Sequence, residues 1–117
     1  MCALLANKTY ADKYYIGFFD LNNLVAIMDL IIAYPDANTA FIGLFMMDSD
    51  YQGKGIGSLI INQCSHYLKQ CGYNNIRLAI MKGNKQSFNF WIKNNFHLTG
   101  EERMTELGKV CLMERIL

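Results

Sequence analysis

The sequence predicts an α/β domain in which helices flank a mixed, mostly antiparallel β-sheet. Apolar runs of strand length recur along the chain and are separated by two segments of helical periodicity. A strand, a helix and another strand follow one another over residues 39–81, and this crossover implies a locally parallel pair of strands. The other strands are joined by short turns, as in antiparallel sheets. At 117 residues with 52% hydrophobic content, the chain has the composition of one domain.

The first part of the chain predicts three strands, over residues 14–20, 24–34 and 39–48. A tight turn at Asn22 and Asn23 joins the first two strands, and a turn around the single proline, Pro35, joins the second to the third. The third strand is a nearly continuous apolar run, which predicts burial on both of its faces.

The second part of the chain predicts two helices and three further strands. Cys64, Leu68 and Cys71 recur at helical spacing in the first helix, and Gly72 is a suitable C-terminal end for it. The predicted elements are a helix over 57–72, a strand over 76–81, a helix over 87–95, and strands over 96–107 and 109–117 around a turn near Gly108.

Composition excludes several classes of function. The net charge of +1, with both signs mixed along the chain, does not predict nucleic acid as a partner. The apolar runs are too short to span a membrane, and no signal peptide is visible. The four cysteines lack the spacing of a metal site, so no metal is predicted. Cys64 and Cys71 are expected to be reduced core thiols, which fits a cytoplasmic protein.

The stretch DSDYQGKGIGSLI, residues 48–60, places three glycines at alternate positions immediately before a helix. A helix start binds anions because its first amides have no internal partners, and glycines let a ligand approach the backbone closely. The spacing does not satisfy the Rossmann fingerprint or the Walker P-loop. It satisfies Q/R-x-x-G-x-G/A through Gln52, Gly55 and Gly57. A glycine-rich turn that only caps a helix is the structural alternative.

In this motif and its position between a strand and a helix, the sequence resembles the GNAT family of N-acetyltransferases. The resemblance implies that backbone amides of the loop bind the pyrophosphate of acetyl-CoA, while Gln52 braces the loop. The preceding strand would pair with the pantetheine arm, and the backbone amide of Met47 would polarise the thioester carbonyl. The implied cofactor-binding residues are Phe45, Met46, Met47, Gln52, Gly53, Lys54, Gly55, Ile56, Gly57, Ser58, Asn84 and Trp91.

A second segment, NKQSFNFWIKNNF, is similar to the family signature N-x-x-A-x-x-x-Y-x-x-x-G-F. Asn84 matches the asparagine that hydrogen-bonds the pantetheine arm, and Asn95 stands in place of glycine. Trp91 stands in place of the tyrosine that often protonates the departing thiolate, and an indole N–H cannot give up its proton near neutral pH. Taken alone, the apolar face of this segment is also typical of ordinary core packing.

Asp29 is the candidate general base, because it interrupts an otherwise apolar strand. A carboxylate in such a place is either partnered or lies at a cavity, and burial would raise its pKa towards a useful value. The alternative is a structural aspartate satisfied by backbone or turn amides.

The resemblance implies one domain, residues 1–117, whose amino-terminal part is short and lacks much of the family's usual first strand and helices. It divides into an amino-terminal remnant (1–13), a strand meander (14–48), the pyrophosphate loop with its helix and strand (49–83), and the second signature with a C-terminal hairpin (84–117). Exposed sheet surface at the front would favour a homodimer. The predicted activity is direct transfer of acetyl from acetyl-CoA to a primary amine of a small molecule or peptide, and the alternative is a non-catalytic acyl-CoA-binding or dimerisation module.

Overall fold

In this computed structural model, residues 13–117 are described, and they form a six-stranded sheet in the order β1-β2-β3-β4-β6-β5. Only β3 and β4 pair in parallel, and the other neighbours pair antiparallel, as the crossover predicts. Residues 1–12 of the predicted remnant (1–13) lie outside the described residues, and its last residue, Lys13, begins β1. The elements are β1 (Lys13–Asp20), β2 (Asn23–Ile32), β3 (Thr39–Met47), a 3₁₀ turn (Ser49–Tyr51), α1 (Ile56–Gln70), β4 (Asn75–Met81), α2 (Lys85–Lys93), β5 (His97–Thr105) and β6 (Gly108–Ile116).

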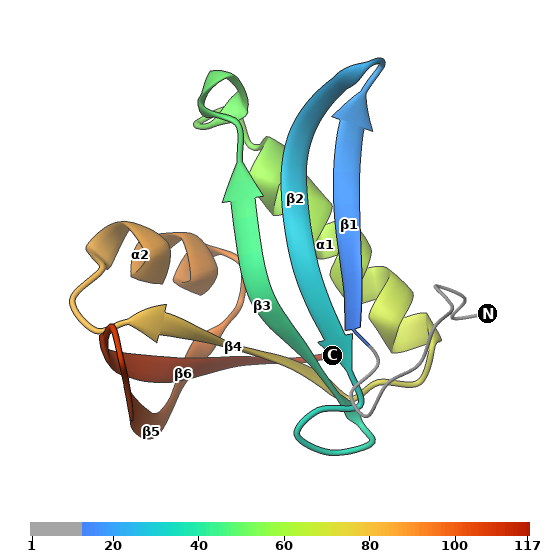
Figure 1. Cartoon of the computed structure of the whole chain (residues 1–117). Coiled ribbons are helices and arrows are strands. Elements are labelled where there is room, and N and C mark those ends of the chain that lie inside the picture. Colours follow the sequence, from blue (N-terminus) through green and yellow to red (C-terminus); the bar gives the residue numbers. More distant parts are fainter. Residues whose placement is uncertain (1–12) are drawn as a thin grey trace.

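The sheet divides into two halves between β3 and β4. These strands pair only from Thr39 to Ile42 of β3, opposite Asn75 to Leu78 of β4. Beyond this point they diverge, so that β1–β3 stand at a steep angle to β4–β6, and α2 lies in the angle between the halves (Figure 1). Helix α1 crosses one face of β1–β3 (Figure 1).

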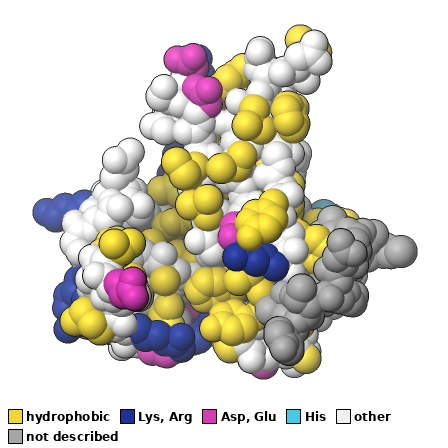
Figure 2. Space-filling model, in the orientation of Figure 1, with side chains coloured by type: hydrophobic (Ala, Val, Ile, Leu, Met, Phe, Trp, Pro, Cys, Tyr) yellow, Lys and Arg dark blue, Asp and Glu magenta, His cyan; other side chains and the backbone are white. Residues whose placement is uncertain are grey.

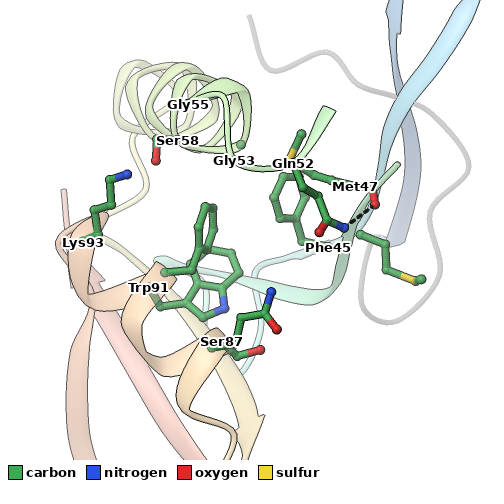
Figure 3. Close-up of a pocket in the computed structure, with 13 residues that line it drawn as sticks. Phe45, Met47, Gln52, Gly53, Gly55, Ser58, Ser87, Trp91 and Lys93 are labelled. Carbon is green, nitrogen blue, oxygen red and sulfur yellow. Dashed lines mark hydrogen bonds between the residues drawn. The ribbon is translucent and has the colours of Figure 1, made fainter. Parts of the chain in front are cut away.

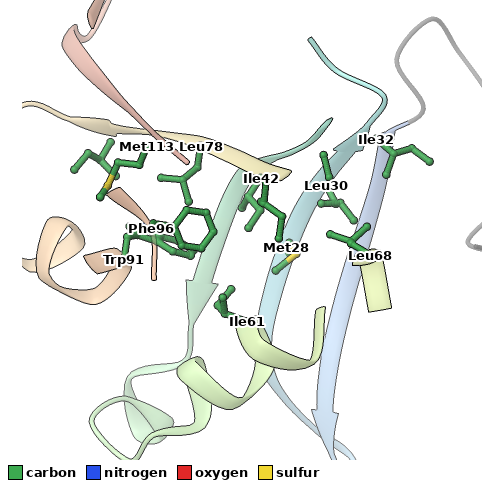
Figure 4. Close-up of a cluster of buried hydrophobic side chains, with 13 residues drawn as sticks. Met28, Leu30, Ile32, Ile42, Ile61, Leu68, Leu78, Trp91, Phe96 and Met113 are labelled. Atoms are coloured by element: carbon green, nitrogen blue, oxygen red, sulfur yellow. The ribbon is translucent and has the colours of Figure 1, made fainter. Parts of the chain in front are cut away.

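The main core lies between α1 and the sheet and continues beneath α2. Alternate residues of β2 and β3, among them Met28, Leu30 and Ile42, pack against Ile61 and Leu68 of α1 (Figure 4). Each such buried side chain stabilises the fold by about 1.5–3 kcal/mol relative to an exposed one. The α1 face of β1–β3 is therefore fixed by the period-two pattern of these strands.

The opposite side of β1–β3, here called the open face, carries exposed apolar side chains. The exposed apolar residues on this face are Tyr15, Phe19, Leu24, Ile27, Leu44 and Met46, and Asp29 lies among them. Figure 2 shows apolar side chains gathered over these strands, with an acidic and a basic group among them. The expectation that residues 39–48 are buried on both faces was therefore wrong for the second half of β3, because Leu44 and Met46 lie on the open face and are 42% and 56% exposed.

The turn between β1 and β2 differs by one position from the expectation. Asp20 pairs with Asn23, so the two turn residues are Leu21 and Asn22 rather than Asn22 and Asn23. Leu21 has a φ of 57°. This backbone conformation is uncommon for leucine, which is why a pattern based on turn propensity misplaces the turn.

Cys64, within α1, and Cys71, just after it, differ in oxidation state. Cys64 is a free thiol packed against the core, and burial raises its pKa from 9.0 to about 11. Cys71 is disulfide-bonded, so the expectation of a reduced core thiol was wrong there. It follows the last residue of α1 and is only partly buried, which places it at the margin of the core.

The raised pKa of Cys64 makes stability depend on alkaline pH. Burial favours the neutral thiol, so its stabilising contribution is complete below pH 9 and is lost as the pH rises from 9 to 11. We expect the free energy of unfolding to fall across this window by up to about 2–3 kcal/mol more in the wild type than in Cys64→Ala. Urea denaturation at several pH values measures both slopes, and parallel slopes would contradict the assignment.

Candidate functional site

A cavity of about 510 Å³ opens where β3 leaves β4. Its walls are the end of β3, the loop before α1, the first turn of α1 and one face of α2 (Figure 3). The lining residues are Phe45, Met46, Met47, Gln52, Gly53, Gly55, Gly57, Ser58, Gln86, Ser87, Phe90, Trp91 and Lys93.

The three glycines of the loop have two different physical roles. Gly53 and Gly55 adopt φ angles of 75° and 80°, a left-handed conformation that other residues adopt only with strain. Gly57 is required for space, since a Cβ atom there would lie 2.7 Å from the Met47 sulfur and 3.2 Å from the Phe90 ring. The loop thus turns sharply and then brings the helix start close to β3 and α2.

The start of α1 offers unpaired amides to the cavity. Gly55 is the N-cap residue and has no side chain to accept a hydrogen bond, and the first intrahelical bond runs from the amide of Leu59 to the Gly55 carbonyl. No acidic residue lies in the first helical turn. The amides preceding Leu59 and the helix dipole therefore favour an anion at this position. Lys93 lies across the cavity from Ser58 and adds positive charge (Figure 3).

Gln52 ties the loop to the preceding strand. Its side-chain amide donates a hydrogen bond of 3.0 Å to the backbone carbonyl of Met47 (Figure 3). This hydrogen bond links the start of the glycine loop to the end of β3. It is the kind of bracing contact that the motif implies for Gln52.

Replacing Gln52 with glutamate is expected to weaken binding of CoA several-fold. The carboxylate cannot donate to the Met47 carbonyl, and its negative charge repels a phosphate at the loop. Isothermal titration calorimetry measures the change. Gln63→Glu, on the exposed side of α1, introduces the same charge elsewhere and should bind CoA as the wild type does. Equal affinities of the two variants would count against the bracing role.

The end of β3 presents unpaired backbone to the same cavity. Pairing with β4 stops at Ile42, whereas the other edge of β3 remains paired with β2 as far as Met47. Apart from the Met47 carbonyl, which accepts from Gln52, the backbone groups of residues 43–47 that face the diverging β4 are available to an extended ligand. The sheet interrupts its hydrogen-bond ladder here, between two strands that are otherwise neighbours.

Helix α2 contributes one wall of the cavity. Asn84 does not line the cavity; it is the N-cap of α2, and its side chain accepts a 3.1 Å hydrogen bond from the amide of Ser87. Lys54 and Ile56 are also absent from the lining. Residues Gln86, Phe90 and Lys93, which the site prediction omitted, line the cavity together with Ser87. Their spacing of four and three residues on one helix is the signal that could have identified them.

Trp91 is mainly a core residue with one edge at the cavity. It is 7% exposed, and its ring lies 4.9 Å from Phe90, 5.0 Å from Phe96 and 6.0 Å from Phe45 between centroids. Phe90 also stacks on Phe45 at 6.1 Å. This aromatic cluster fixes α2 against β3 and so sets the width of the cavity.

Asp29 lies apart from the cavity lining, on the open face of β2. Its Oδ2 is 3.2 Å from Nζ of Lys13, and its Oδ1 is buried without a hydrogen-bond partner among the described residues. The structure thus brings together the loop, the end of β3 and Trp91, but leaves Asp29 on the neighbouring strand. Over residues 13–117, no group of side chains is suited to hold a metal ion, and no helix is long and apolar enough to cross a membrane.

A split parallel strand pair, a glycine-rich loop and an open helix start together line one cavity between the two central strands of a mixed sheet. The sequence of residues 3–96 matches the model of the acetyltransferase (GNAT) family. The chain belongs to this family, and the family prediction is confirmed. No curated protein matches the sequence.

Solved structures share the fold at low sequence identity. An acetyltransferase from Thermus thermophilus matches with a TM-score of 0.74 and 19% identity over 90% of this chain and 64% of its own. PaiA N-acetyltransferase from Thermoplasma acidophilum, in complex with coenzyme A, matches with a TM-score of 0.72 and 24% identity over 90% and 61%. Ard1 from Thermoplasma volcanium matches with a TM-score of 0.76 and 18% identity over 88% and 70%. The predicted fold class is confirmed, and the chain spans less than two thirds of the first two structures.

Proposed function

We propose that this protein transfers an acetyl group from acetyl-CoA directly to a primary amine. The observation that carries the proposal is the joint placement of unpaired α1 amides and unpaired β3 backbone along one cavity. The helix start suits a pyrophosphate, and the edge of β3 suits an extended amide-containing arm such as pantetheine. Solved structures with the same fold include one in complex with coenzyme A, which supports this choice of ligand.

In the proposed site, Gly53, Gly55 and Gly57 allow the loop amides to approach the pyrophosphate, and Lys93 adds positive charge at its edge. The backbone of Phe45–Met47 holds the pantetheine arm and directs an amide at the thioester carbonyl, which is the role we assign to Met47. An amide preorganised in this way stabilises negative charge that develops on the carbonyl oxygen. Positioning of this kind supplies much of the rate when few acid–base groups are present.

The proposed reaction needs a neutral amine. A primary ammonium with a pKa of about 10.4 gives one proton to a base, for which Asp29 is the candidate, and the nitrogen lone pair then forms a bond to the thioester carbon. The carbon–sulfur bond breaks, and the electron pair leaves on the CoA thiolate. The acetylated nitrogen releases its second proton to water, and the thiolate takes a proton from water, since the Trp91 indole cannot supply one.

Release of free CoA in the presence of a panel of amines tests the proposed activity. We expect release above the amine-free background with at least one primary amine, together with an increase in thermal stability on adding CoA. Absence of a thermal shift with CoA would overturn the assignment of the cavity. A thermal shift without release for any amine would favour the second candidate.

The second candidate is a non-catalytic acyl-CoA-binding module. The specific observation in its favour is Trp91, which fills the position of a proton donor with a core side chain that cannot ionise. It predicts CoA binding as tight as that of an enzyme, without acetyl transfer.

A homodimer remains a prediction of the sequence. Within the described residues, β1 is an edge strand, and Phe19, Leu21 and Leu24 at its tip are 64%, 90% and 46% exposed. Exposed strand edges and apolar tips of this kind favour association. Size-exclusion chromatography with light scattering at micromolar concentration is expected to give twice the 13.4 kDa mass of one chain. A stable monomer would contradict the prediction.

A further inference from the structure

Asp29 is a charged residue placed in the middle of the open face. On the face of the sheet it lies between Tyr15 of β1 and Leu44 of β3, which are its direct cross-strand partners. Its side chain is 16% exposed, and Oδ1 has no hydrogen-bond partner among the described residues. A largely buried carboxylate with an unused acceptor destabilises the fold, so its presence calls for a ligand that satisfies it.

Lys13 shows what kind of group this position accepts. Its Nζ lies 3.2 Å from Asp29 Oδ2 and 5.3 Å from the centre of the Tyr15 ring. Hydrogen bonding to Tyr15 and to Asp29 raises the pKa of Lys13, so both neighbours favour the charged ammonium. A carboxylate beside an aromatic face is a suitable environment for a primary ammonium group.

The contact with Lys13 is replaceable. Lys13 is the first residue of β1 and its side chain is 42% exposed, so its ammonium group can move into solvent without disturbing the core. Gly43 lies against the other side of the carboxylate, where a Cβ atom would be 3.4 Å from Asp29 Cγ. The site therefore has one mobile wall, formed by Lys13, and one fixed wall, formed by the backbone of β3.

The position also connects to the candidate cavity. Leu44, opposite Asp29, is followed two residues later by Met46, which is on the same face and lines the cavity. Diagonal neighbours on adjacent strands lie about 7–8 Å apart, so an amine released from Asp29 crosses a short distance on the same face to reach a thioester held beside Met46. Ile27, opposite Met46, makes this path apolar.

We propose that Asp29 and Tyr15 bind the primary ammonium group of the acceptor, and that Lys13 of the same chain occupies this site until the acceptor displaces it. The proposal rests on the proposed function, because it names the acceptor of that reaction. The ligand class is a primary alkylammonium with an unbranched apolar stem, as Lys13 itself presents. Among the described residues of the open face, Asp29 is the acidic group and Lys13 is the basic group that the acceptor displaces, while the cross-strand neighbours are aromatic or aliphatic, which disfavours acceptors with further charges close to the amine.

Titration of the ¹⁵N-labelled protein with n-butylammonium chloride tests the site by NMR without requiring catalysis. We expect saturable shifts of the amide signals of Tyr15, Asp29 and Leu44. Asp29→Asn should abolish them, and tetramethylammonium, which has no N–H donor, should not produce them at the same concentration. Shifts that persist in Asp29→Asn, or that both cations produce equally, would overturn the proposal.

Lys13→Met is the sharper test, because it changes a partly exposed side chain at the start of β1. It tests the site even if Asp29→Asn fails to fold. Removing the internal competitor is expected to tighten butylammonium binding at least threefold. Lys69→Met, at the far end of α1, removes the same charge elsewhere and should leave the affinity unchanged. Unchanged or weaker binding in Lys13→Met would overturn the proposal.

A parallel titration with CoA separates this inference from the proposed function. Shifts of the amides of residues 53–58 with CoA report the loop, whereas shifts at Asp29 with butylammonium report the open face. Loss of the first response alone would overturn the proposed function. Loss of the second alone would overturn the ammonium site and leave the proposed function standing.

Discussion

Gly55→Val is expected to lower the affinity for CoA at least tenfold while the domain remains folded. Gly55 has a φ of 80° and is the N-cap residue of α1. A β-branched residue is strained there by about 1–2 kcal/mol, and its side chain enters the space that the ligand phosphates require. A tenfold loss corresponds to about 1.4 kcal/mol of binding free energy, which calorimetry resolves.

Gly72→Val is the matched control for this variant. Gly72 lies just beyond the other end of α1 and has a φ of 95°. A Cβ atom added at Gly72 would have no other atom within 4 Å, and the same is true at Gly55. Valine at either position therefore imposes a similar backbone strain, which urea denaturation measures. Only Gly55→Val should lose CoA affinity. An equal loss in both variants would show that general destabilisation, and not the loop, is responsible.

Trp91→Ala is expected to reduce the free energy of unfolding by about 3–5 kcal/mol. Trp91 contacts three aromatic rings, of Phe45, Phe90 and Phe96, and its removal leaves a cavity beneath α2 that these rings cannot fill. A small domain has about 5–15 kcal/mol of total stability, so this variant is close to unfolding at room temperature. Denaturant melts followed by far-ultraviolet circular dichroism provide the measurement.

The neighbouring position supplies the comparison. Ile92 is on the same helix but is 42% exposed, so Ile92→Ala should cost much less than Trp91→Ala. Similar losses for the two variants would contradict the core role of Trp91. Trp91→Phe preserves most of the ring packing and removes the indole N–H; it should retain the turnover of the wild type if the indole takes no part in proton transfer.

The sequence predicted the order of the elements and the loop for physical reasons that are local. Alternation in β2, the helical spacing of α1 and the run of alternate glycines before α1 each depend on a few neighbouring residues. The exposure of Leu44 and Met46 could not be predicted in this way. An apolar run has the same appearance whether or not another element covers its second face, because burial depends on the tertiary arrangement.

The candidate site was predicted best where backbone geometry defines it and less well where side chains do. Gln52 has the bracing bond that its motif position implied. Asn84, matched to a ligand contact, also caps α2 through its side-chain oxygen, because an asparagine before a helix satisfies one of the first free amides. Lys93 and Phe90 reach the cavity only because the aromatic cluster sets the rotation of α2, which depends on contacts with β3 distant in sequence.

The short parallel pairing of β3 and β4 has a mechanical consequence. Four residue pairs join the two halves of the sheet at one end, so the halves form a hinge whose open end is the cavity. An extended molecule that hydrogen-bonds to the free edge of β3 and packs on α2 would contact both halves and restrict their movement relative to each other. Occupancy of the site is thereby linked to the rigidity of the whole sheet, and an empty domain is expected to bend more easily along this line than a filled one.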